Sequence, residues 1–193
     1  MKDKKGVIVL IAGMVILLIG ATALYTQLRK STAAPDQLAV QTTAPTEQGQ
    51  TQPPAEKAAD FKVYDADGNP HRLSDYFGKP IVLNFWASWC GPCKSEMPDF
   101  QGKYDLLGKD IQFLMVNMTD GQRETVEVAS NFLAEAGYTF PVLFDTDYYA
   151  AMTYEVYSLP TTVFIDAQGN LVARATGAID AATLQKGIDM IAG

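Results

Sequence analysis

Residues 60–193 are predicted to form an α/β domain whose sheet is parallel at first and antiparallel at one edge. Two nearly continuous apolar runs, Ile81–Trp86 and Ile111–Asn117, are typical of strands that are buried on both faces. Segments with helical apolar spacing alternate with these strands, which favours parallel strands joined by helices. A hairpin signal near the C-terminal end of the chain then adds antiparallel strands. This stretch is long enough to bury one hydrophobic core.

The individual elements follow from local signals. A first hairpin is predicted where Phe61–Tyr64 and His71–Leu73 flank the turn sequence Asp67-Gly68-Asn69. A helix should begin near Gly91, after the first buried strand. The later elements are a helix over Arg123–Ala136, a short strand over Phe140–Phe144, a helix over Asp147–Tyr157, strands over Thr162–Asp166 and Leu171–Thr176 around Gln168-Gly169-Asn170, and a closing helix over Asp180–Ile191 with Asp180 as its N-cap.

Residues 1–30 are predicted to be a membrane anchor. Lysines precede an uncharged run whose apolar part, Val7–Tyr25, is close to the roughly 20 residues that span a bilayer as a helix. The basic residues slightly favour an N-terminus inside and the remaining chain outside the cell. The alternative is a cleavable signal peptide, because Ala21-Thr22-Ala23 looks like a cleavage site.

Residues 31–59 are predicted to be a disordered linker. They are rich in Ala, Thr, Gln and Pro and contain no aromatic residue, so they lack the apolar surface needed to fold. Such a tether reaches on the order of 30 Å. We therefore expect the domain over 60–193 to be held near a bilayer, but not against it.

The overall composition excludes several classes of function. The net charge is -7, and an acidic chain without a basic cluster in its folded part is a poor nucleic-acid binder. One histidine and two cysteines are too few for the usual zinc site, so we expect no metal. The sequence has no nicotinamide or flavin fingerprint. We therefore expect no cofactor, and electrons must come from another protein.

The motif that carries chemistry is Trp89-Cys90-Gly91-Pro92-Cys93, directly after a buried strand. A C-x-x-C beside a strand–helix pattern is typical of redox proteins, and two cysteines three positions apart can close a small disulfide ring. Cys90 lies at a helix N-terminus, where unpaired N–H groups and the helix dipole favour a thiolate. We therefore predict that Cys90 attacks a substrate disulfide and that Cys93 resolves the mixed disulfide. A structural disulfide and half of a metal site are the alternatives; further metal ligands are lacking, and so small a loop would add little stability.

The stretches NFWASWCGPCKSEMPDF and, about seventy residues later, SLPTTVFID resemble the thioredoxin superfamily. The resemblance is closest to membrane-anchored thiol–disulfide oxidoreductases of the TlpA/ResA type, and it covers nearly all of 60–193. It implies a thioredoxin-like fold: a central mixed sheet flanked by helices, with an N-terminal hairpin and a central insertion over Gln122–Tyr157. It also implies that Pro160 is the family's cis-proline beside the cysteine pair, that the Leu159 backbone binds an extended substrate, and that Trp89 is the aromatic residue next to the nucleophile.

The same resemblance assigns a role to Glu96, which matches the acidic residue that ResA-type proteins carry three positions after the second cysteine. The buried aspartate of ordinary thioredoxins is replaced here by Asn84, which cannot accept a proton. Glu96 lies one helical turn after Cys93 and, if partly buried, could exchange protons with the thiols. The alternative is an ordinary solvated surface glutamate.

These features predict a membrane-tethered, extracytoplasmic thiol–disulfide oxidoreductase on a single-pass anchor. Reduction of protein disulfides is the expected direction, because CGPC is the pair of thioredoxin, whose potential is about -270 mV. The resemblance implies a CcdA-like integral membrane donor and a C-x-x-C-H disulfide of apocytochrome c as target. The alternatives are a peroxiredoxin-like peroxidase, which needs a threonine where Ala87 stands, and a non-catalytic redox sensor or binding module.

Overall fold

The structure, a computed structural model, describes residues 13–14, 38–40 and 56–193. The predicted anchor lies outside the described residues except for Gly13 and Met14, which are helical. Within the described part of the chain, no helix is both long and apolar enough to cross a membrane.

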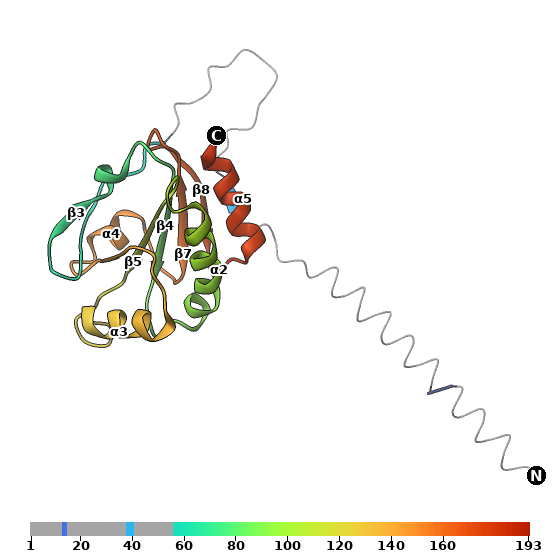
Figure 1. The fold of residues 1–193 in the computed structure, drawn as a ribbon, viewed down its shortest axis with the longest axis horizontal. Helices are drawn as coiled ribbons and strands as arrows, with labels where there is room; N and C mark the ends of the chain where they lie inside the picture. Colours follow the sequence, from blue (N-terminus) through green and yellow to red (C-terminus); the bar gives the residue numbers. More distant parts are fainter. Residues whose placement is uncertain (1–12, 15–37, 41–55) are drawn as a thin grey trace, which may run out of the picture. The chain divides into compact units, whose positions relative to one another are not determined.

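An eight-stranded sheet organises residues 38–40 and 56–193, with the strand order β1-β8-β7-β4-β5-β6-β2-β3 (Figure 1). The strands are β1 (Leu38–Val40), β2 (Lys62–Tyr64), β3 (Pro70–Arg72), β4 (Ile81–Trp86), β5 (Gln112–Asn117), β6 (Val142–Phe144), β7 (Thr161–Ile165) and β8 (Leu171–Thr176). The helices are the 3-10 helix η1 (Leu73–Tyr76) and the α-helices α2 (Gly91–Leu107), α3 (Val126–Ala136), α4 (Tyr149–Thr153) and α5 (Ala181–Ala192).

The mixed sheet confirms the predicted α/β class. β4 pairs in parallel with β5, and β5 pairs in parallel with β6. On the other side of β4, the strands β7, β8 and β1 follow in antiparallel pairing. The predicted first hairpin forms between β2 and β3. The sheet differs from the prediction at its other edge, because this hairpin joins β6 through the antiparallel pair Tyr64 and Phe144. Both edges of the sheet are therefore antiparallel.

Residues 38–40 differ from the predicted disordered linker, since they form β1. This strand pairs antiparallel with β8, with Leu38 opposite Ala175 and Val40 opposite Ala173. Without β1, the outer edge of β8 would have unpaired backbone N–H and C=O groups. Three residues are enough to form a strand here, because they pair with these groups and the side chain of Leu38 is only 5% exposed. Ala58, also within the predicted linker, is buried, and its N–H donates to the carbonyl of Gly169.

Two predicted helices are shorter than their apolar patterns. α3 begins at Val126 rather than Arg123, because the hydroxyl of Thr125 caps it by accepting a hydrogen bond from the N–H of Val128. α4 covers only Tyr149–Thr153, since Tyr148 and Glu155 on either side adopt left-handed backbone conformations (φ 56° and 48°). α5 begins as predicted, with the carboxylate of Asp180 accepting from the N–H of Thr183.

The sheet separates two hydrophobic clusters, because successive side chains of a strand point to opposite faces. On β4, Val82 and Trp86 face the cluster formed with α2, α3 and α5, whereas Leu83 and Phe85 face the cluster beneath α4. Helices α2 and α5 pack on each other over the first face (Figure 1). Asn84, between Val82 and Trp86 in the alternation, therefore places a polar side chain under α2.

Candidate active site

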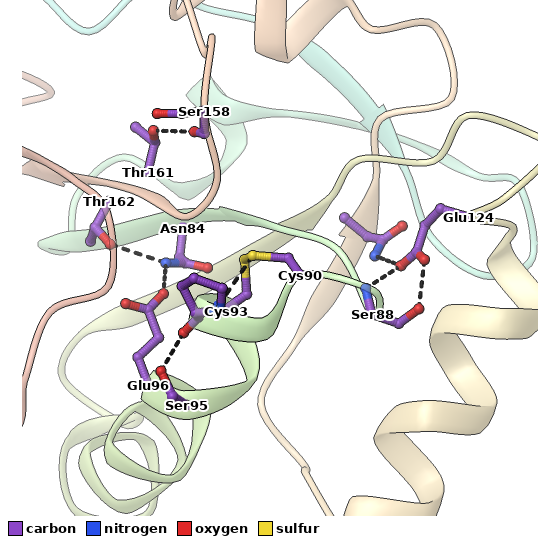
Figure 2. Close-up of a disulfide and its surroundings, with 12 residues drawn as sticks. Asn84, Ser88, Cys90, Cys93, Ser95, Glu96, Glu124, Ser158, Thr161 and Thr162 are labelled. Carbon is purple, nitrogen blue, oxygen red and sulfur yellow. Dashed lines mark hydrogen bonds between the residues drawn. A yellow bond between two sulfur atoms is a disulfide. The ribbon is translucent and has the colours of Figure 1, made fainter.

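Cys90 and Cys93 form a disulfide at the N-terminal end of α2, with an S–S distance of 2.09 Å (Figure 2). Cys90 is the N-cap residue, and its Sγ accepts a hydrogen bond from the N–H of Cys93 at 3.2 Å. Pro92 lies in the first turn, where its missing N–H costs nothing. Cys90 is 5% exposed and Cys93 is fully buried, so the first sulfur is the more accessible one, as the predicted roles require.

Glu96 is buried beside the pair and is not a solvated surface residue. Its side chain is 2% exposed. Oε1 accepts a hydrogen bond from Nδ2 of Asn84, and Oε2 accepts one from the N–H of Ile179, both at 2.9 Å. Burial raises the pKa of Glu96 to about 7, although these two hydrogen bonds act in the opposite direction. Near neutral pH this carboxyl can therefore either accept or release a proton.

Asn84 connects Glu96 to the sheet. Its Nδ2 also donates to the hydroxyl of Thr162 on the neighbouring strand β7, at 3.0 Å (Figure 2). Both residues are fully buried. The Oδ1 atom of Asn84 is buried without a hydrogen-bond partner in the described part of the chain.

The loop before β7 contains the predicted cis-proline, since the Leu159–Pro160 bond is cis. Pro160 is buried, and its carbonyl accepts a hydrogen bond from the N–H of Gly177 at 2.9 Å. Leu159 is half-buried and packs against the cluster that contains both cysteines. Among the described residues, no hydrogen bond occupies the backbone N–H or C=O of Leu159. Those two groups are thus available to an extended peptide.

Trp89 forms part of the surface next to Cys90. Its side chain is 42% exposed, whereas Trp86 is fully buried in the core. The guanidinium of Arg123 lies over the Trp89 ring, 4.4 Å from its centroid. The cation covers one face of the Trp89 ring. The rest of the exposed ring surface is apolar and can contact a bound protein.

A second buried glutamate, which sequence reasoning missed, holds the loop before Cys90. Glu124 is fully buried, and its carboxylate accepts hydrogen bonds from the N–H and the hydroxyl of Ser88 and from Nδ2 of Asn117, each at 2.6 Å (Figure 2). The available signal was weak: Asn117 ends a buried strand with a polar side chain. Glu124 itself stands in a polar stretch that gives no sign of burial.

Ala87, where a peroxidase would need threonine, is fully buried. Within the described residues, no group of three or more His, Cys, Asp or Glu side chains is placed to hold a metal ion.

A redox disulfide at a helix N-terminus, a cis-proline loop and this mixed sheet define a thioredoxin-like thiol–disulfide oxidoreductase. Residues 54–174 match the AhpC/TSA family, and the chain belongs to that family. Within it the chain is ResA-like: thiol-disulfide oxidoreductase ResA from Geobacillus kaustophilus (strain HTA426) is 36% identical over 135 residues, which cover 69% of this chain and 75% of that protein.

Solved structures agree with this assignment. A thiol:disulfide interchange protein of Chlorobium tepidum described as DsbE is 33% identical, with a TM-score of 0.61 over 72% of this chain and 97% of that one. An exposed lipoprotein thioredoxin from Streptococcus pneumoniae strain TIGR4 is 36% identical, with a TM-score of 0.58 over 68% of this chain and 99% of that one. The activity of the chain is therefore thiol–disulfide exchange.

Proposed function

We propose that this chain is a membrane-tethered reductase that works outside the cytoplasm and reduces disulfides of substrate proteins. The reductive direction rests on the C-G-P-C sequence, the pair that thioredoxin carries, whose potential is about -270 mV. The observation that carries the attack on a disulfide is the arrangement around Cys90. Its sulfur already receives an N–H from the helix N-terminus, and the same donor stabilises the thiolate that attacks a disulfide.

The reaction has two steps. The Cys90 thiolate attacks one sulfur of the substrate disulfide, so that the substrate's other sulfur leaves as a thiolate and takes up a proton. Cys93 then gives up its proton and attacks Cys90, which releases the second substrate sulfur and closes the Cys90–Cys93 disulfide. The substrate gains two electrons, and the enzyme is oxidised to the state seen in the structure.

Glu96 is the proton acceptor and donor for the resolving step. It lies one turn after Cys93 on the same helix, is buried, and has a pKa of about 7, close to the pH at which exchange proceeds. Asn84 stands at the strand position where thioredoxin has its aspartate, and an amide cannot accept the proton. The carboxyl of Glu96 takes over this role from the helix side of the site.

The substrate is bound as an extended segment beside Leu159. The unoccupied N–H and C=O groups of Leu159 pair with the backbone of the substrate, and the exposed Trp89, next to Cys90 in the chain, supplies apolar contact. The C-x-x-C-H disulfide of apocytochrome c is the substrate that the ResA-like character favours, because ResA-type proteins act before haem attachment.

The location and the electron donor follow from the N-terminal segment. The apolar run Val7–Tyr25 anchors the chain, with the catalytic domain on the outer side of the membrane. A CcdA-like integral membrane thiol protein then returns the Cys90–Cys93 pair to the dithiol form. The S. pneumoniae relative, described as an exposed lipoprotein, is consistent with work outside the cell.

The function is tested by trapping with the full chain. A synthetic apocytochrome c segment with its C-x-x-C-H cysteines oxidised is mixed with reduced wild type, Cys93→Ser and Cys90→Ser. We expect the wild type to release the reduced peptide, Cys93→Ser to accumulate a mixed disulfide through Cys90, and Cys90→Ser to form none. Equal adducts with both variants would contradict the assigned roles, and oxidation of the dithiol peptide by the oxidised enzyme, without reduction, would contradict the direction.

The location is tested on intact cells after mild reduction. A membrane-impermeant maleimide should label Cys90 of the wild type but leave Cys90→Ser unlabelled. Labelling that occurs only after lysis would show that the domain faces the cytoplasm.

A further inference from the structure

One acceptor atom beside the disulfide has no partner. Asn84 is fully buried in the centre of β4, and its Oδ1 accepts no hydrogen bond in the described part of the chain. A buried carbonyl oxygen without a donor is unfavourable, because it has lost its hydrogen bonds to water and no protein group replaces them. Most such atoms in folded proteins are paired, so an unpaired one beside a reactive group points to a donor that exists in another state of the protein.

The orientation of the amide follows from its neighbours. Nδ2 donates to Oε1 of Glu96 at 2.9 Å and to the hydroxyl of Thr162 at 3.0 Å. These two acceptors hold the NH₂ end on the side of Glu96 and β7. The oxygen end must then face the other way, and Figure 2 shows it turned toward the Cys90–Cys93 pair.

Of the two cysteines, Cys93 is the better placed to meet this oxygen, because it shares its side of α2 with Glu96. Asn84 lies on the face of β4 that α2 covers, and Cys93 is buried in the hydrophobic cluster on that face. Cys93 and Glu96 are one helical turn apart, so the two residues occupy the same side of α2. Asn84, bonded to Glu96, therefore lies beneath the N-terminal half of the helix. Cys90, the N-cap, lies further toward the surface.

We propose that Oδ1 of Asn84 accepts a hydrogen bond from the Cys93 thiol in the reduced protein, which makes Asn84 a positioning residue for the resolving cysteine. In the disulfide, neither sulfur carries a proton and the oxygen has no donor. Reduction by a donor dithiol breaks the S–S bond, oxidises the donor to its own disulfide and leaves a proton on the sulfur of Cys93. That S–H is the donor that the oxygen lacks.

The contact has two consequences for thiol–disulfide exchange. It favours the reduced protein, because the buried acceptor is paired only in that state. It also holds Cys93 as a protonated thiol while Cys90 is the thiolate, so that Cys93 attacks only after Glu96 has taken its proton. Glu96 is the titratable group that contacts the Asn84 amide; Asp99 on the same helix acts on it through space, and β7 contributes the non-titrating hydroxyl of Thr162.

The proposal rests on exchange chemistry at this cysteine pair and not on the direction or the location proposed above. Its test needs no substrate, so it can fail without affecting either of those. The Cys90→Ser variant of the full chain has one thiol, that of Cys93. The infrared S–H stretching band of this variant reports directly whether the thiol donates a hydrogen bond.

The reference is a simple alkanethiol in hexane, whose S–H group makes no hydrogen bond. We expect the S–H band of Cys90→Ser to lie at a lower frequency than the band of this reference. Adding Asn84→Leu, which keeps the shape but removes the oxygen, should shift the band up to that reference. Adding Thr162→Val instead removes a different partner of the same amide and should leave the band in place. A band at the hexane position with Asn84 intact would overturn the proposal, even if the Asn84→Leu protein does not fold.

The redox equilibrium gives a second readout on proteins that have both cysteines. Equilibration with glutathione should show that Asn84→Leu shifts the ratio of disulfide to dithiol toward the disulfide by about fivefold, the usual contribution of one hydrogen bond. Thr162→Val, as the matched control, should leave the ratio within twofold. Equal shifts in both variants, or none in Asn84→Leu, would show that the amide is merely structural.

Discussion

Two buried asparagine–glutamate pairs lie at neighbouring strands and serve different purposes. On β4, Asn84 donates to Glu96, whose other oxygen accepts a single backbone N–H. On β5, Asn117 donates to Glu124, whose carboxylate also accepts both the N–H and the hydroxyl of Ser88. The difference lies in what each carboxylate holds. Glu124 fixes the loop before Cys90, whereas Glu96 stands beside the cysteines and titrates near neutral pH.

The comparison teaches that burial alone does not define a catalytic carboxyl. Both side chains are nearly inaccessible to water. The carboxylate of Glu124 holds a loop in place. Glu96 lies one helical turn after Cys93, where burial raises its pKa to about 7. Glu124 should therefore matter most for stability, and Glu96 for pH dependence and exchange.

The largest effect is expected for Glu124→Ala. The substitution leaves the Ser88 N–H and the Asn117 amide buried without an acceptor, which should lower the free energy of unfolding by about 3–5 kcal/mol. Denaturant unfolding of the oxidised protein measures this change. Glu127→Gln, at an exposed glutamate of α3, is the control and should change stability by less than about 0.5 kcal/mol. A Glu124→Ala protein as stable as this control would show that the loop is held by other contacts.

The next effect is the pH dependence of stability that Glu96 causes. Its pKa is raised from 4.5 to about 7, so the folded protein binds the proton more tightly than the unfolded chain does. The stability from this group is complete below pH 4.5 and is lost as the pH rises through 7, a difference of about 3 kcal/mol. Unfolding of the oxidised protein measures the contribution of Glu96 without one from the cysteines, because cysteines in a disulfide do not titrate.

Glu96→Gln should remove this slope between pH 4.5 and 7. If wild type and Glu96→Gln show parallel pH curves, burial does not raise the pKa of Glu96 in the folded protein.

A smaller effect is expected on the rate of exchange. Glu96→Gln keeps the shape of the side chain but can neither take nor return a proton, so thiol–disulfide exchange at pH 7 should slow by about tenfold. The pH profile of Cys90 alkylation should change as well, because the two titrations are coupled. Glu127→Gln again serves as the control. An unaltered alkylation profile in Glu96→Gln would place the proton acceptor elsewhere.

The smallest effect is expected at the rim of the site. Arg123→Ala removes the cation over Trp89, an interaction of about 0.5–1 kcal/mol at an exposed position. Trp89 fluorescence should become easier to quench by iodide, and stability should fall by no more than this amount. Lys94→Ala is the matched loss of charge, because Lys94 is exposed on α2 and lies over no aromatic ring in the described part of the chain. Identical quenching in both variants would show that Arg123 does not cover the ring.

Much of the fold could be read from local patterns. The run Ile81–Trp86 is apolar because both faces of β4 are covered, and the predicted strand is confirmed residue for residue. The helix start at Gly91 follows from the C-G-P-C order, since proline tolerates the first turn. β1 was not predictable, because Leu38–Val40 becomes a strand only where the edge of β8 is available to pair with it.

The sequence by itself determined the chemistry of this protein: two cysteines three apart at the start of a helix, and a glutamate one turn further on. These relations are local, and helix geometry alone sets the distances within them. Only the tertiary structure decided that Glu96 is buried against Asn84, that Glu124 reaches back to Ser88, and that the Leu159 backbone is left unpaired. Each depends on segments distant in sequence meeting in a dry interior, where desolvation raises the pKa of Glu96 and leaves the Asn84 oxygen unpaired.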